Sequence, residues 1–296
     1  MDHWDEIRTA YHVARAGTVS GAADALGIHH ATAIRHIDAL ETRLGVKLFQ
    51  RHARGYTPTE AGADLARIAR TTDEQFSQLG GRLKGQGERV TGDLVVTALT
   101  SFSPLLAPVL TKFQIKHPEV NIKLLTGSRL FKLAYGEAHV ALRAGHAPED
   151  LDNVVQPLLK MSLGLYAAPS YLERYGMPTA DNLSEHRFVG LDYIASRAPF
   201  RKWLTDQIPT ESIRFQVADD RAMEAAITAG AGIGFAMRGA LQGAVEVMEP
   251  KPEWVSSVWL VTHVDLHRSA KVQAILSDLK EAAQRWAETE PGMSLP

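Results

Sequence analysis

Apolar positions in residues 18–44 recur at helical spacing and predict two short helices around a glycine turn. Thr18 is the expected N-cap of the first helix, and Gly27 supplies the left-handed residue that ends it. The apolar face of the first helix is formed by Val19, Ala22, Ala23 and Leu26. In the second helix, apolar positions at alternating helical spacings predict a buried stripe of Ala33, Ile37, Leu40 and Leu44.

The outer face of the second helix carries the side chains that could contact DNA. A helical wheel places Ala31, Arg35, Asp38 and Thr42 opposite the buried stripe, with Thr32, Ile34 and Ala39 on its flanks. A glycine-turned helix pair with Arg and Thr on its outer face is typical of a DNA-binding helix-turn-helix. From these residues alone, an ordinary helical hairpin with a solvated face is an equal alternative.

The following motifs extend this pattern: AAxxL (Ala22, Ala23, Leu26), IxxLExxLGxxLFxR (Ile37 to Arg51), Gly55 and TEAG (Thr59 to Gly62). Over about the first 62 residues the chain closely resembles the LysR-type transcriptional regulators, and the resemblance continues more loosely to the C-terminus. It implies an α/β protein with an α-rich winged helix-turn-helix domain, a long dimerising linker helix and an effector domain built like a periplasmic binding protein, with two α/β subdomains. The corresponding boundaries are residues 1–58 (helix-turn-helix about 19–38), 59–87 and 92–296, with subdomain I at about 92–166 and 267–296 and subdomain II at about 167–266.

Candidate DNA contacts follow from this resemblance and from the charges. The family commonly begins its recognition helix with a Ser-Gln-Pro-like run, whereas this chain has His29, His30 and Ala31. Residues 46–58 predict a two-stranded wing with Arg51, His52 and Arg54 at its tip, where they would contact phosphates or, alternatively, form a solvated hairpin. Ile34, where a Ser is usual, would pack on a thymine methyl or on the wing. The predicted DNA-binding residues are His29, His30, Thr32, Ile34, Arg35, Arg51 and Arg54.

A long helix beginning after Thr59 has a coiled-coil pattern. Leu65, Ile68, Thr72, Phe76, Leu79 and Leu83 recur at spacings near 3.5 residues. Such a seam predicts a homodimer, and a two-fold dimer predicts a pseudo-palindromic operator in double-stranded DNA. The family resemblance also suggests a homotetramer on DNA. Residues 85–91 are expected to form a hinge into the next domain.

From Asp93 onward, strand and helix patterns alternate, which predicts a parallel α/β domain. Ligands of such domains bind near the carboxyl ends of strands and the N-termini of helices. The polar residues expected at that edge are Thr100, Ser101, Gly127, Ser128 and Arg143. They suggest a small anionic effector, although helix caps and a surface arginine also occur in most α/β proteins. His139 stands where the family commonly has Asp.

Composition limits the alternatives. The formal net charge is −2, so any attraction to DNA must come from a local patch. Absence of Cys excludes disulfides and thiol chemistry, and neither a signal core nor an apolar run of about 20 residues is present, which predicts a cytoplasmic protein without a membrane segment. No metal, cofactor or catalytic residue is predicted, because neither ligand spacing nor a nucleophile motif is apparent. A solute-binding transport protein would explain only the C-terminal domain, and an enzyme neither domain.

Overall fold

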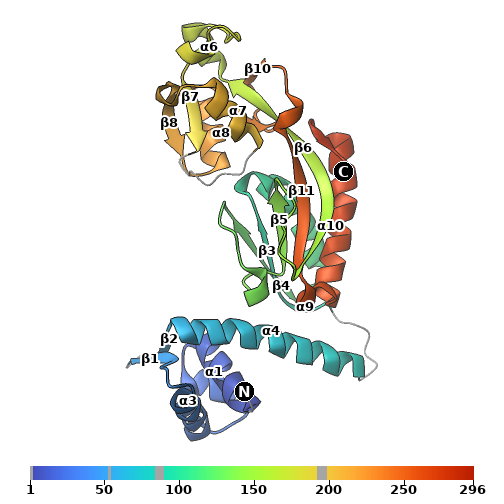
Figure 1. Cartoon of the computed structure of the whole chain (residues 1–296). Helices are drawn as coiled ribbons and strands as arrows, with labels where there is room; N and C mark the ends of the chain where they lie inside the picture. Colours follow the sequence, from blue (N-terminus) through green and yellow to red (C-terminus); the bar gives the residue numbers. More distant parts are fainter. Residues whose placement is uncertain (1–2, 53–54, 84–89, 192–198) are drawn as a thin grey trace. The chain divides into compact units, whose positions relative to one another are not determined.

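The computed structural model describes residues 3–52, 55–83, 90–191 and 199–296 (Figure 1). The chain divides into two compact units, residues 1–89 with 132–137 and residues 90–131 with 138–296. Most of the hinge predicted at residues 85–91 lies outside the described residues. The predicted wing residue Arg54 lies outside them as well.

The first unit begins with three helices that form the predicted helix-turn-helix. They are α1 (Trp4–Ala16), α2 (Val19–Leu26) and α3 (His30–Leu44). The Thr18 hydroxyl accepts a hydrogen bond from the Gly21 N–H and caps α2, and Gly27 has a φ of 65°. A left-handed residue at this point ends α2 and lets the chain turn into α3. Both cap predictions are confirmed.

A two-stranded wing and a long helix complete this unit. Strands β1 (Phe49–His52) and β2 (Gly55–Pro58) pair antiparallel, and α4 (Glu60–Leu83) follows. The core contains buried residues from α1 to α4 and from the start of the wing, including Val13, Ala22, Ile37, Leu48 and Ala69.

One predicted core position is wrong. Leu44 is 41% exposed, whereas Glu41, one turn earlier, is buried. The apolar spacing could not show this, because burial depends on which other parts of the chain cover each turn of the helix.

The TEAG motif holds the start of α4 against the chain before the wing. The Thr59 hydroxyl donates to the Lys47 carbonyl at 2.7 Å, and the Thr59 N–H donates to the Leu48 carbonyl at 2.9 Å. A Cβ atom on Gly62 would lie only 1.9 Å from that Leu48 carbonyl oxygen. Glycine is therefore required at this position by the close approach of two backbone segments.

The second unit is built on a mixed sheet. Strand β3 (Gly92–Ala98) pairs parallel with β4 (Val120–Thr126) and β5 (Val140–Ala144), as predicted. However, β6 (Asn153–Ala167) and β11 (Val255–His263) pair antiparallel with each other, and β11 also pairs antiparallel with β5. The sheet is therefore mixed, because these two strands carry the chain out of the first subdomain and back again.

The second subdomain lies between these two strands in sequence. The far end of β6 pairs with β9 (Gly234–Met237) and β10 (Val245–Met248), so this single strand contributes to both subdomains (Figure 1). Strands β7 (Phe188–Leu191) and β8 (Ile213–Val217) form a separate parallel pair. Strand β11 returns the chain to the first sheet, where Val258 to Val261 pair with β5. The remaining elements of this subdomain are α6 (Pro169–Tyr175), η3 (Leu183–Glu185), α7 (Pro199–Gln207), η4 (Thr210–Ser212), α8 (Asp220–Thr228) and η5 (Pro252–Trp254).

Helices of the first subdomain bury the apolar stripes expected from their sequences. Short η1 (Thr100–Phe102) leads directly into α5 (Ser103–Lys116), and α10 (Ala270–Thr289) packs on α5 and β6. The apolar residues Val272, Ile275, Leu279, Ala283 and Trp286 recur along α10 at spacings of three and four, which predicts one inward face, and all five are buried. The other elements of the second unit are α9 (Val264–His267) and β12 (Met293–Ser294), and η2 (Leu133–Tyr135) belongs to the residues grouped with the first unit.

Replacing Gly62 with Ala is expected to destabilise the first unit by about 3 kcal/mol, because a backbone carbonyl cannot move away as a flexible side chain would. Hydrogen exchange of peptides spanning residues 45–65 in the full chain measures this loss. Gly45→Ala is the matched control, since a Cβ there meets nothing within 4 Å and only the left-handed φ of 70° opposes it, a cost of about 1 kcal/mol. Equal losses in the two variants would contradict the role assigned to the close approach.

Candidate DNA-binding face and effector edge

The outer face of α3 forms an open groove at the surface of the first unit. Its lining contains the four positions that the helical wheel placed outward, Ala31, Arg35, Asp38 and Thr42. The flanking Ile34 and Ala39, and also Arg43, complete the lining. His29 and His30 are exposed at the start of α3, and the His29 side chain makes no capping hydrogen bond. Thr32 is half-buried, and Ile34 is half-buried against the core, so its apolar surface is shared between the domain interior and the groove.

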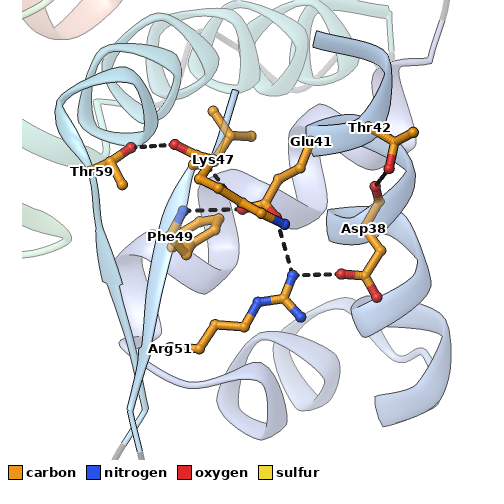
Figure 2. A network of polar contacts seen from close by, with 8 residues as sticks. Asp38, Glu41, Thr42, Lys47, Phe49, Arg51 and Thr59 are labelled. Carbon is orange, nitrogen blue, oxygen red and sulfur yellow. Dashed lines mark hydrogen bonds and ion pairs between the residues drawn. The ribbon is translucent and has the colours of Figure 1, made fainter. Parts of the chain in front are cut away.

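Beneath this face, the Glu41 carboxylate joins α3 to the wing (Figure 2). Its Oε1 atom accepts hydrogen bonds from the backbone N–H groups of Leu48 at 2.9 Å and Phe49 at 3.2 Å. Its Oε2 atom accepts from Lys47 Nζ at 2.7 Å and from Arg51 Nη2 at 3.2 Å. Glu41 is only 3% exposed, so this buried charge is balanced by two cations and two backbone dipoles.

Burial by itself would raise the pKa of the Glu41 carboxyl. The hydrogen bonds from Lys47 and from the N–H groups of Leu48 and Phe49 outweigh burial and hold the pKa below its ordinary value. Glu41 therefore stays ionised through the physiological pH range. Sequence reasoning identified Glu41 only as part of a motif, although an acid on the buried side of a helix could have indicated this role.

Arg51 lies on the wing but is bound to α3. Its Nη2 atom donates to Asp38 Oδ1 at 2.5 Å as well as to Glu41, and its guanidinium lies 5.3 Å from the centre of the Tyr56 ring. The hydrogen bond to Asp38 raises the pKa of Arg51, so the charge is permanent. Arg51 thus orients the wing as well as being a candidate for phosphate contact, which the sequence alone had not indicated.

The other cations near α3 differ in how they are engaged. Arg43 donates to both oxygens of Glu6 at 2.7 and 3.1 Å, and Lys47 is held by Glu41. Arg35 is exposed and forms no ion pair with the described residues. Among the described residues of this face, the Arg35 guanidinium can therefore donate hydrogen bonds to a ligand without first breaking an ion pair.

The predicted effector residues lie at the carboxyl ends of neighbouring strands in the second unit. Thr100 and Ser101 form η1 after β3, and Gly127 and Ser128 follow β4. However, two of their backbone groups are already bonded within the chain. The Gly127 N–H donates to the Ala98 carbonyl at 3.0 Å, and the Ser101 N–H donates to Asp220 Oδ2 at 2.8 Å. A helix start after β3 would be expected to offer free N–H groups to a ligand, but the N–H group of Ser101 is already bonded.

Arg143 lies near the end of β5 and is half-buried. Its Nη2 atom donates to the Phe131 carbonyl at 3.0 Å, and it forms no ion pair among the described residues. Burial lowers the pKa of the Arg143 guanidinium, while the charge of Asp150 acts in the opposite direction. A positive charge partly removed from water without a paired carboxylate favours a negatively charged ligand.

The structure assigns a local role to His139, which replaces the usual Asp of the family. The side chain is buried, and its Nδ1 atom accepts a hydrogen bond from the Val95 N–H at 2.9 Å. The His139 N–H in turn donates to the Val95 carbonyl at 2.9 Å. The imidazole thus accepts a strand N–H as a carboxylate would, and it ties the start of β5 to β3.

Within the described residues, no group of three or more His, Cys, Asp or Glu side chains is arranged to hold a metal ion. A search of the same residues found no helix with both the length and the apolar character needed to cross a membrane. The glycines of residues 230–234 form a tight turn from α8 to β9, the order opposite to that of a dinucleotide-binding loop.

Family models match nearly the whole chain. The model described as "Bacterial regulatory helix-turn-helix protein, lysR family" matches residues 4–63, and that described as "LysR substrate binding domain" matches residues 87–284. These two regions contain, respectively, the α3 face with the wing and the strand edge of the second unit.

Individual relatives are similar over different lengths. An HTH-type transcriptional regulator of Xanthomonas campestris is 36% identical over 60% of this chain, and the match spans about half, 52%, of that protein. The HTH-type transcriptional regulator IlvY of Escherichia coli is 30% identical over 77% of this chain and 79% of its own length. Among solved structures, full-length LysG of Corynebacterium glutamicum with bound effector Arg has a TM-score of 0.61 at 18% identity, covering 95% of this chain and 98% of that one.

Glu41→Gln is expected to weaken the attachment of the wing to α3 by about 1–3 kcal/mol at neutral pH. Because the native pKa of Glu41 is lowered, its stabilising effect is fully present above the ordinary Glu pKa of about 4.3 and is lost as pH falls through the native pKa. The difference between wild type and variant should therefore shrink on acidification. Hydrogen exchange of residues 30–60, measured from neutral pH down through the native pKa of Glu41, tests the expectation.

Asp24→Asn, at an exposed position of α2, is the control for removing a carboxylate charge without a buried network. It should change exchange of the wing little at any pH. A pH-independent difference between wild type and Glu41→Gln would show that the Glu41 charge does not hold the wing.

Proposed function

Because this chain belongs to the LysR family of bacterial transcriptional regulators, whose members bind operator DNA, respond to small-molecule effectors and form oligomers, we propose that it recognises its operator through the outer face of α3. The unpaired Arg35 guanidinium on that face carries the proposal. DNA binding is a cytoplasmic activity in bacteria, so we propose a cytoplasmic protein. No catalytic step is involved.

The proposed contacts divide into two groups. Thr32, Arg35 and the exposed His30 would face base edges in the major groove, and Ile34 would contact a thymine methyl. His29, Arg51 and Arg54 would contact phosphates, which position the protein but carry little sequence information. Because Arg51 is bound to Asp38 and Glu41, its main contribution would be to hold the wing at a defined angle to α3.

Arg35→Ala is expected to weaken binding to the preferred sequence by about 1–3 kcal/mol and to relax selectivity at one base position. The preferred sequence is first obtained by selection from random duplexes with the wild-type protein, and affinities are then measured by gel shift at fixed salt. Arg15→Ala, at an exposed position of α1, is the control for loss of one positive charge. Unchanged selectivity in Arg35→Ala would remove this residue from base recognition.

We further propose that α4 carries the homodimer. Ile68 and Phe76 are 53% and 54% exposed in the single chain, although Phe76 also contacts the edge of the Trp4 ring. Leu65, by contrast, packs partly against the core of its own unit. The exposed part of the predicted seam therefore begins at Ile68. Two-fold pairing through this face supports a pseudo-palindromic operator, and the family supports a homotetramer on DNA.

Ile68→Asp is expected to shift the oligomer toward monomer, since a large apolar side chain contributes about 1.5–3 kcal/mol when buried and the symmetric interface loses it twice. Sedimentation velocity over a range of protein concentrations measures the change. Ile115→Asp is a matched control, because Ile115 is also an exposed isoleucine on a helix but lies in α5. An Ile68→Asp protein that remains fully oligomeric would overturn the assignment to α4.

The proposed effector is a small anion held at the edge formed by Thr100, Ser101, Gly127, Ser128 and Arg143. Its anionic nature is supported by two observations: the Ser101 N–H already donates a hydrogen bond to a carboxylate, and Arg143 is half-buried without an ion pair among the described residues. Effector binding would change the relative orientation of the subdomains that β6 and β11 connect. Coupling to DNA requires that the effector bind the two states with different affinity, typically by about 1–3 kcal/mol.

Arg143→Gln is expected to reduce affinity for the natural effector about tenfold or more, through loss of a charge-assisted hydrogen bond. A thermal-shift screen of carboxylated metabolites identifies the effector, and calorimetry with wild type and variant gives the affinity ratio. Lys123→Gln, at an exposed position on β4, controls for the change in net charge. Equal effector affinity in wild type and Arg143→Gln would exclude Arg143 from the site.

A further inference from the structure

One hydrogen bond joins the two subdomains directly at the proposed effector edge. The backbone N–H of Ser101, in η1 after β3, donates to Oδ2 of Asp220 at 2.8 Å. Asp220 is the first residue of α8 in the second subdomain and is 119 residues away in sequence. A residue of the second subdomain thus places a carboxylate on the N–H group that sequence reasoning had assigned to an external anion.

Asp220 is not required to cap its own helix. The preceding residue, Asp219, is the N-cap of α8, and its side chain accepts the Ala222 N–H at 2.8 Å. The neighbouring cation is also engaged elsewhere, because Arg221 donates to Glu224 at 2.8 Å. Asp220 has no ion-pair partner among the described residues. Its carboxylate instead accepts the hydrogen bond from the Ser101 N–H at the start of η1.

This environment is chemically the one that would hold the carboxylate of a free ligand. A backbone N–H at a strand-to-helix turn stabilises one negative charge, and a second carboxylate brought to the same place would be repelled by the first. Only one of the two anions can occupy the Ser101 N–H at a time. Release of Asp220 would also remove a bond that holds the subdomains together.

We infer that Asp220 is an internal competitor for the anionic group of the effector, and so determines which ligands the edge accepts. This inference rests on the proposed anionic effector site. A simple carboxylate with no further contacts fails to displace Asp220, whereas the natural effector displaces it by making additional contacts. Effector binding then replaces an intramolecular bond between the subdomains with ligand-mediated ones.

The test uses the full chain without DNA and with acetate as the probe carboxylate. In Asp220→Ala, backbone hydrogen exchange of residues 99–106 is expected to rise at least about threefold, because the protecting acceptor is gone. Millimolar acetate should restore protection there in the variant but leave wild type unchanged. Acetamide, which has nearly the same shape and no charge, should have no such effect, and Asp206→Ala, at an exposed position of α7, should behave as wild type.

Unchanged exchange of residues 99–106 in Asp220→Ala, or equal protection of wild type by acetate, would overturn the inference. If residues 220–228 also lose protection in Asp220→Ala, the comparison is made with Asp220→Asn, which keeps the size and one oxygen acceptor but removes the charge. Acetate protection of residues 99–106 in that variant supports competition, and its absence overturns it. Failure of the proposed DNA-binding function would appear instead in the gel-shift measurements, which involve neither Asp220 nor acetate.

Discussion

The arrangement of the DNA-binding unit depends on one buried carboxylate. Glu41 faces away from the outer surface of α3 and accepts hydrogen bonds from two backbone N–H groups that lead into the wing. Without it, those N–H groups would be buried without partners, Lys47 would lose the carboxylate that holds it, and Arg51 would keep only its hydrogen bond to Asp38. The angle between α3 and the wing is therefore set by a buried contact within the unit. This angle must match a DNA groove and the adjacent phosphates.

The same network sorts the cations by role. Asp38 and Glu41 hold Arg51, and Glu6 holds Arg43, whereas the exposed Arg35 forms no ion pair with any residue that the structure describes. An arginine already bound to carboxylates gains less from a phosphate than an unpaired one, because it must share or exchange its hydrogen bonds. In a chain with a net charge of −2, this selective pairing leaves a local positive charge on the face proposed to contact DNA.

In the second unit, the orientation of the two subdomains is constrained by the strands that connect them, β6 and β11. Strand β6 pairs with β11 at one end and with β9 and β10 at the other, so a change in subdomain angle must be absorbed along this continuous backbone. The Ser101–Asp220 hydrogen bond lies away from these strands in sequence and closes the subdomains against each other. The proposed anionic effector would compete for this bond and so act where a small local change can alter the angle.

The sequence by itself determined the elements whose causes are local. Thr18 and Gly27 define the turn between α2 and α3, and the apolar stripe of α10 predicts its buried face, because caps and helical periodicity depend on residues only a few positions apart. The TEAG motif marked the start of α4, although only the close approach of Gly62 to the Leu48 carbonyl explains why glycine is needed there. The motif pattern was sufficient to indicate the family.

Tertiary structure decided which polar groups meet. The spacing of residues 38–51 did not show that Leu44 would be 41% exposed or that Arg51 would turn toward α3. Ser101 and Asp220 are 119 residues apart, and their contact exists only because the strands return the chain to the first sheet. Burial and charge pairing depend on distances in space rather than along the chain, and for this reason the elements could be predicted while the partners of their charges could not.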